Sequence, residues 1–197
     1  MRTTSAVLLL GILAAPAAAG AQGAPASSPA GPATAASSAT GARFETGAIY
    51  AGPRLWIGNL NGATAIGAQA ERGFTTAGQY GPGIIAGGVG IDYYSWSNDF
   101  AIGSYDYSVI PIQVFGNYHI PIESNRKLDP YVGLAFVYSI VNASWDGPGV
   151  GDVDASASGS DIAGQAGLRY FINEKFAVQG QLGFGYGTLG IGATWKF

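Results

Sequence analysis

The sequence ends in Thr188-Leu-Gly-Ile-Gly-Ala-Thr-Trp-Lys-Phe197, and this stretch decides the fold. Apolar side chains alternate strictly with small or polar ones, which is a period of two residues. This period predicts a β-strand with one apolar face. The ends of soluble chains usually fray, so two aromatic residues within the last three positions favour a strand that closes a membrane barrel. The apolar set consists of Leu189, Ile191, Ala193, Trp195 and Phe197.

The composition excludes several classes of function. Only 11% of the 197 residues are charged, the net charge is −3 and no basic run is present, which argues against a nucleic-acid partner. The chain has no cysteine and a single histidine, His119, so it lacks the residues for most metal sites and nucleophile–base pairs. We therefore expect no metal, no cofactor and no enzymatic activity.

The N-terminus has the features of an exported protein. An apolar run at 6–15 is followed by a small-x-small cleavage site at 19–21, so residues 1–21 are predicted to be a signal peptide. A membrane-spanning helix is the alternative, but it would need about 20 apolar residues. Residues 22–45 are predicted to be a disordered linker, because almost all of them are Ala, Ser, Pro, Gly or Thr. The folded domain is then 46–197.

Seven further segments repeat the alternation of the last strand. With the last ten residues, they predict an all-β fold: an eight-stranded antiparallel up-and-down transmembrane β-barrel. One segment is Ala-rich and could be a short helix, although a strand is favoured there. An even strand number places both ends of the barrel on one side, and the one long loop is expected at 144–160. The segments lie near 47–58, 63–72 (the Ala-rich one), 83–97, 104–121, 129–144, 161–172, 175–184 and 188–197.

The second face of these segments indicates which side points inward. It is mostly Gly, Ala, Ser and Gln with a few charges of both signs, whereas a soluble barrel would use many Lys and Glu on its exterior. A lipocalin-like soluble barrel is therefore the weaker alternative. Inside a narrow lumen the charges need partners, so a paired structural cluster is favoured over an ion-selective path. The predicted lumen cluster is Arg54, Glu71, Asp92, Arg169 and Lys196.

With these features assembled, residues 46–197 resemble the small outer-membrane β-barrels of Gram-negative bacteria, the OmpA-like or porin-family barrels. The resemblance rests on the final strand and on the strand starts Gly47-Ala-Ile-Tyr-Ala-Gly-Pro-Arg54 and Lys127-Leu-Asp-Pro-Tyr-Val-Gly-Leu134. It implies an outer-membrane location with the linker in the periplasm. It also implies that the apolar set of the last strand is an assembly signal. The implied partners are outer-membrane lipid, lipopolysaccharide, the barrel assembly machinery and periplasmic chaperones.

Three other features could suggest chemistry. Gly185-Tyr-Gly-Thr-Leu-Gly190 matches a nucleotide-binding pattern formally, but a strand follows it instead of a helix, so hairpin glycines are favoured. His119 is expected in the lumen or an interfacial girdle rather than in a lipid-modifying active site. An acidic set near the outer loops is expected to be a solvated surface; the alternative is divalent cations bridging to lipopolysaccharide phosphates. The set is Asp99, Asp106, Asp146, Asp152, Asp154 and Asp161, with Asp146, Asp152 and Asp154 in the long loop.

The predicted function is therefore that of a structural or surface-interaction outer-membrane barrel without a wide pore. A narrow porin-like channel for small solutes is the main alternative. A soluble periplasmic binding barrel and a lipid-modifying enzyme are weaker ones.

Overall fold

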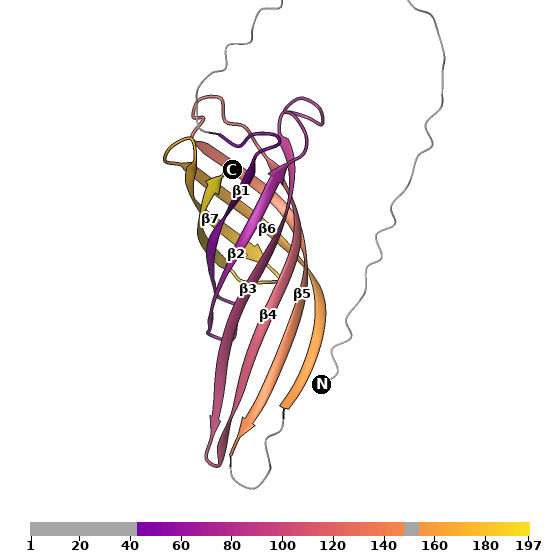
Figure 1. The fold of residues 1–197 in the computed structure, drawn as a ribbon, viewed down its shortest axis with the longest axis vertical. Helices are drawn as coiled ribbons and strands as arrows, with labels where there is room; N and C mark the ends of the chain where they lie inside the picture. Colours follow the sequence, from indigo (N-terminus) through magenta and orange to yellow (C-terminus); the bar gives the residue numbers. More distant parts are fainter. Residues whose placement is uncertain (1–42, 148–153) are drawn as a thin grey trace, which may run out of the picture. The chain divides into compact units, whose positions relative to one another are not determined.

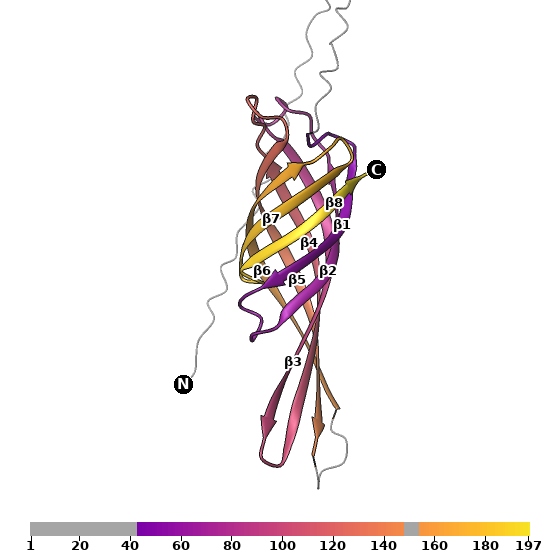
Figure 2. The same ribbon diagram turned by 90° about the vertical axis from the view of Figure 1, so that its left-hand side faces the viewer.

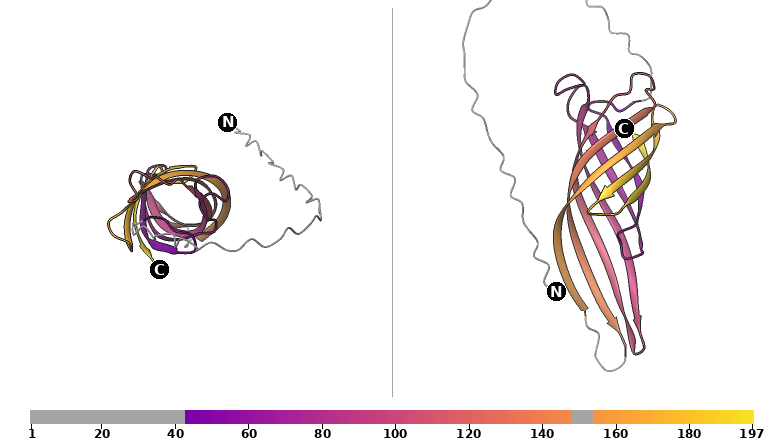
Figure 3. Two further views of the ribbon diagram at one scale, coloured as in Figure 1. Left: turned by 90° about the horizontal axis from the view of Figure 1, so that it is seen from above. Right: turned by 180° about the vertical axis from the view of Figure 1, so that it is seen from behind.

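The computed structural model describes residues 43–147 and 154–197, and every regular element in them is a β-strand. The eight strands form one closed antiparallel barrel in sequence order, and β1 pairs with β8 to complete the ring (Figures 1 and 3). The predicted fold class is thus confirmed, and the Ala-rich segment is strand β2. The strands are β1 (Ile49–Ile57), β2 (Thr64–Gly73), β3 (Ile84–Phe100), β4 (Gly103–His119), β5 (Leu128–Asp146), β6 (Asp154–Phe171), β7 (Phe176–Phe184) and β8 (Leu189–Lys196).

The predicted signal peptide and the linker up to residue 42 lie outside the described residues. No helix in the described ranges is long and apolar enough to cross a membrane.

The barrel has its apolar side chains outside and its polar ones inside. Ile66, Leu134 and Ile191 are 57–66% exposed, whereas Arg54 and Arg169 are at most 1% exposed. A barrel in water would have the opposite arrangement, since exposing so much apolar surface to water is unfavourable. The alternation therefore fits a barrel surrounded by lipid.

The strands differ in length, and this difference shapes the molecule. The strands β1, β2, β7 and β8 have 8–10 residues, whereas β3, β4, β5 and β6 have 17–19. The long strands continue together past the short ones as a four-stranded sheet (Figure 2). We call this part the extension and define it as residues 94–109, 141–146 and 154–157.

Much of the predicted loop at 144–160 is strand. β5 runs to Asp146 and β6 begins at Asp154, so the connection is only 147–153, most of which is not described. From Tyr93 to Phe100, steps of about 3.3 Å per residue carry the sheet roughly 20 Å beyond the last β2–β3 pair.

Aromatic side chains on the inner face hold the extension together. The Trp96 and Tyr107 rings are a cross-strand pair, stacked 4.9 Å apart with an interplanar angle of 9°. Tyr105 and Trp145 form a second cross-strand pair at 4.6 Å. Such cross-strand aromatic pairs stabilise a sheet. Within residues 43–147 and 154–197, no strand pairs with the outer edge of β3 beyond Tyr93 or with the outer edge of β6 before Gly164.

The two chain ends of the barrel meet at the end opposite the extension, which we call the terminal end. The Phe197 amide donates to the Ile49 carbonyl at 2.8 Å, so the last residue completes the β1–β8 seam. Basic residues gather at this end, whereas the extension has none and carries four aspartates. The basic residues there are Arg43, Arg72, Arg126, Lys127, Lys175 and Lys196.

Candidate functional site

The lumen holds two layers of buried charge between two apolar layers. In the first charged layer Arg54 of β1 binds Asp92 of β3 with two hydrogen bonds, Nε to Oδ1 at 2.9 Å and Nη2 to Oδ2 at 2.7 Å. The third guanidinium nitrogen donates to Gln69 Oε1 at 3.0 Å, and Gln113 Nε2 donates to Asp92 Oδ2 at 2.9 Å. Because both charged side chains are fully buried, each compensates the other's loss of water.

Glycines next to Arg54 and Asp92 leave the space that this layer occupies. A Cβ added at Gly90 would collide with Arg54 Nη2, and one added at Gly67 would collide with Asp92 Oδ1. The glycines on the inner face therefore make room for the ion pair inside a ring of only eight strands.

The second charged layer surrounds Glu71 of β2, nearer the terminal end. Arg169 Nη2 donates to Glu71 Oε2 at 2.7 Å, and His119 Nε2 lies 3.0 Å from Glu71 Oε1. His119 Nδ1 lies 2.8 Å from Asp129 Oδ1, and Asn117 donates to Glu71 at 2.6 Å. Carboxylate oxygens only accept, so both contacts of His119 are hydrogen bonds when its ring carries two protons. The imidazolium form also balances the layer at two positive and two negative charges.

An aromatic cap closes the lumen at the terminal end. The Phe44 ring stacks on the His119 ring at 3.7 Å and 2°, and on Tyr50 at 4.6 Å. The Arg169 guanidinium lies 5.4 Å from the Phe44 centroid and 5.3 Å from that of Tyr50. A cavity of about 380 Å³ opens outside this cap, and Phe44, His119 and Asp129 are among its lining residues.

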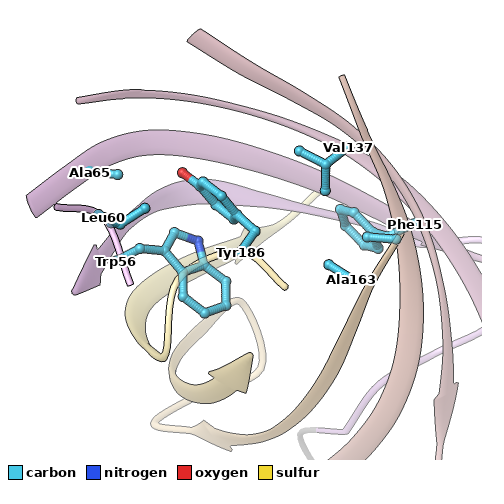
Figure 4. Close-up of a cluster of buried hydrophobic side chains, with 8 residues drawn as sticks. Trp56, Leu60, Ala65, Phe115, Val137, Ala163 and Tyr186 are labelled. Carbon is cyan, nitrogen blue, oxygen red and sulfur yellow. The ribbon is translucent and has the colours of Figure 1, made fainter. Parts of the chain in front are cut away.

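An apolar plug closes the lumen toward the extension. Trp56, Phe115 and Tyr186 are its largest members, drawn from β1, from β4 and from the loop that follows β7 (Figure 4). The Trp56 and Tyr186 rings meet edge to face at 5.9 Å. The full cluster is Trp56, Leu60, Ala65, Phe115, Ala135, Val137, Ala163 and Tyr186.

The predicted lumen residues fall into these two layers, with one correction. Arg54 and Asp92 form the first layer, and Glu71 and Arg169 belong to the second. Lys196 does not join them: its Nζ pairs with Glu45 Oε1 at 2.6 Å, and both side chains are partly exposed. The strand register explains the difference, because Lys196 lies opposite Tyr50 at the rim, where a long side chain reaches water.

The other predicted residues are placed as follows. In the last strand Leu189, Ile191, Trp195 and Phe197 point outward with 41–78% exposure, and Ala193 is half-buried. Asp146 and Asp154 lie on the ends of β5 and β6 instead of in a loop, and Asp152 is outside the described residues. Within residues 43–147 and 154–197 no three His, Cys, Asp or Glu side chains gather closely enough to hold a metal ion.

Sequence reasoning missed two of the central residues. Asp129 stands directly before Pro130, a position that indicates only the start of β5, yet it binds the only histidine. Phe44 lies within the predicted linker at 22–45, yet it is 4% exposed and forms the cap. The signal available for Phe44 was its size, since it is the first aromatic residue after the Ala/Ser/Pro/Gly-rich stretch.

Eight antiparallel strands closed into a ring, apolar outside and polar inside, have the fold of the small eight-stranded outer-membrane barrels. No protein-family model and no curated protein sequence matches the chain. Among solved structures, Ail, the attachment invasion locus protein of Yersinia pestis, is similar with a TM-score of 0.51 at 14% identity, covering 78% of this chain and 100% of that chain.

Two further solved structures are similar at lower scores. Ail in complex with the heparin analogue sucrose octasulfate gives a TM-score of 0.49 at 15% identity over 78% of this chain and 100% of that one. The N-terminal β-barrel domain of Pseudomonas aeruginosa OprF gives 0.45 at 16% identity over 77% of this chain and 98% of that one. At sequence identities as low as these, the similarity indicates the fold and does not indicate the function.

Proposed function

We propose that the protein is a non-enzymatic barrel of the bacterial outer membrane that presents a rigid sheet outside the cell. The observation that carries this proposal is the extension, a four-stranded sheet stiffened by aromatic pairs and projecting beyond the apolar band. Strands of 17–19 residues are longer than membrane anchoring requires, since strands of about 10 residues suffice to span a bilayer. The terminal end, with the linker, would then lie in the periplasm.

The lumen supports a role without transport. A solute would have to displace the Phe44 cap, two layers of paired charge and the Trp56–Tyr186 plug in turn. Separating paired charges in a narrow lumen is costly, so spontaneous opening would be rare. The narrow channel is therefore the weaker candidate.

The surroundings of His119 argue against a lipid-modifying enzyme. Its two ring nitrogens are engaged by Glu71 and Asp129, and Phe44 covers its face. It points into the lumen, away from the lipid that such an enzyme would act on. The outward apolar band likewise argues against a soluble binding barrel.

The proposed partners follow from this location. The outward apolar band would contact outer-membrane lipid, and the extension would stand among lipopolysaccharide. The alternating last strand that ends in Phe197 is proposed as the segment that the barrel assembly machinery recognises, after delivery by periplasmic chaperones.

Trimming the extension tests the proposal. Residues 95–108 and 142–156 would each be replaced by Asn-Gly, which makes a tight hairpin at the Tyr94–Val109 and Val141–Ala157 pairs. We expect the trimmed protein to fold, shown by a heat-modifiable gel shift, and to restore envelope resistance to detergent in a deletion strain. We expect it to lose adhesion of the producing cells to surfaces. Adhesion equal to that of the full chain would contradict the proposed role.

Planar-bilayer recording tests the alternative. The purified full-length protein should give no single-channel steps. Stable steps that are abolished by blocking residues in the lumen would favour the narrow channel instead.

A further inference from the structure

The outer face of the extension is a regular array of small polar side chains. The β-sheet register aligns two rows of four residues across β3, β4, β5 and β6. All eight point outward, opposite to the aromatic inner face. The row nearer the membrane is Ser95, Ser108, Asn142 and Ser156, and the farther row is Ser97, Asp106, Ser144 and Asp154.

These eight side chains line a groove of about 600 Å³. The groove ends at Tyr93, whose side chain is 47% exposed and which is the last large outward-facing residue of β3 before the serines. Neighbouring strands are about 4.8 Å apart and alternate residues about 7 Å, so the array extends roughly 14 Å by 7 Å. Its size is that of a binding site for a small molecule or a short chain.

Nearly all of the polar groups in the groove are available to a ligand. In the parts of the chain that the structure describes, the only side-chain hydrogen bond among the eight joins Ser97 Oγ to Asp106 Oδ1. The remaining hydroxyls, the Asn142 amide and the Asp154 carboxylate have no protein partner there. Together they offer donors and acceptors in alternation over a flat surface.

The charge of the extension restricts the ligand. It contains Asp99, Asp106, Asp146 and Asp154 and no Lys or Arg. Phosphate, sulfate and carboxylate groups would therefore be repelled, and a ligand that is neutral or carries ammonium groups would be favoured. The metal-ion alternative lacks support, because no three acidic side chains converge here among the described residues.

We propose that this groove binds an external glycan that has no phosphate or sulfate, either neutral or bearing free amino groups. The edge of a pyranose ring carries hydroxyls that donate and accept at once, which matches the alternating Ser, Asn and Asp groups. The apolar face of a sugar packs on an aromatic ring, and Tyr93 supplies one at the membrane-side end of the groove. A glycan chain running across the strands would meet a new polar side chain at each strand.

This inference deepens the proposed surface role, because it names the class of molecule that the extension would bind. It also distinguishes between two sources of sugar. The phosphate-rich inner sugars of lipopolysaccharide in the same membrane carry the charge that the aspartates repel, so the ligand is expected to come from outside the cell's own outer leaflet.

The test is direct binding to the full-length protein in phospholipid nanodiscs, measured by saturation-transfer NMR and titration. The probes are cellohexaose, which is neutral, a glucosamine hexamer, which is cationic, and a sulfated heparin hexasaccharide. We expect binding of the first two and none of the third. The S108A/N142A variant should bind both sugars about tenfold more weakly, and D106N/D154N should weaken mainly the glucosamine hexamer, by a similar factor.

The matched control is D99N/D146N. It removes the same charge from the same face one row farther out, at Asp99 and Asp146, which both pair with Ser104 and do not line the groove. It should leave the binding of both unsulfated sugars within about twofold of the parent, since no direct contact is lost. A loss of glucosamine-hexamer binding in the control equal to that in D106N/D154N would overturn the assignment to the groove.

Other outcomes would also overturn the proposal. They are the absence of binding to both unsulfated sugars, tighter binding of heparin, or loss of cellohexaose binding when lipopolysaccharide is added to the nanodiscs. The assay uses purified protein and does not depend on adhesion. A failed adhesion experiment therefore leaves the groove testable, and an empty groove leaves the surface role testable.

Discussion

The buried pair of Arg54 and Asp92 allows a quantitative test of how the lumen is stabilised. In D92L the guanidinium loses two charge-assisted hydrogen bonds, at 2.9 and 2.7 Å, and keeps only the neutral Gln69 partner at 3.0 Å. Removing one partner of a fully buried pair costs about 3–5 kcal/mol, because the remaining charge is uncompensated. At about 1.4 kcal/mol per factor of ten, the folding equilibrium constant should fall roughly 10²- to 4 × 10³-fold.

The double variant R54M/D92L separates the cost of an unpaired charge from the value of the pair. It replaces both partners with apolar side chains of similar size, so we expect its stability to return to within about 1–2 kcal/mol of the parent. The assay is reversible urea unfolding in lipid vesicles, followed by tryptophan fluorescence and by heat-modifiable gel mobility. D99L, which removes an exposed carboxylate from the extension, is the control and should unfold like the parent.

Two results would refute this reasoning. The first is a decrease of less than about 1 kcal/mol in the free energy of unfolding of D92L, which would mean that water in the lumen solvates the unpaired Arg54 guanidinium well. The second is a loss of unfolding free energy in R54M/D92L that equals the sum of the losses in R54M alone and D92L alone. This result would show that the two side chains do not stabilise each other.

Three further predictions concern the cap, the seam and the last residue. F44A should lower the free energy of unfolding by about 3–5 kcal/mol, because it removes a buried ring stacked on His119; the exposed F74A is its control in the same urea assay. G52A should slow or prevent closure of the β1–β8 seam, since its Cβ would collide with the Ala193 carbonyl oxygen, whereas G180A, which meets nothing within 4 Å, should fold normally; equal gel shifts for the two would contradict this. Deleting Phe197 should strongly reduce the amount of folded protein in cells but should reduce the yield of refolding into detergent micelles only slightly, while K196A should change neither quantity. Equal losses in cells and in micelles would argue against an assembly signal.

Most of the barrel could be predicted from the sequence because its signal is local. Each membrane-spanning stretch alternates between large apolar and small or polar residues, and lipid outside a narrow lumen demands this pattern at every strand. The terminal strand shows it most clearly, and β2 shows it least because alanine suits either face. The same logic identified Arg54, Glu71, Asp92 and Arg169 as inward-facing.

The extension was only partly predictable, because along the β6 part of it both faces carry only small or polar side chains. Residues 154–160 read Asp-Ala-Ser-Ala-Ser-Gly-Ser, which contains no large apolar side chain and therefore predicts a loop. In water neither face must be apolar, so alternation carries little information there. What fixes these residues as strand is pairing with β5, which a one-dimensional pattern does not reveal.

The alternating pattern likewise could not predict how deep in the lumen a polar side chain lies or which side chain it contacts. Lys196 has the inward parity of Arg169 but lies at the rim, and the inward parity of Asp129 in β5 does not show that it contacts His119. At Pro111 the β4–β5 pairing continues in one register. The β3–β4 pairing also keeps its register on either side, with a gap at the proline, which has no N–H to donate.

The unequal strand lengths give the outer sheet a freedom that the rest of the molecule lacks. Its hairpins can grow or shrink at their tips, at Ala101–Ile102 between β3 and β4 and at the β5–β6 connection, without touching any residue that faces lipid or lumen. Changes in steps of two residues on each strand preserve which side chains face outward. Over evolutionary time, such a barrel could keep one conserved anchor while altering how far it reaches and what it displays.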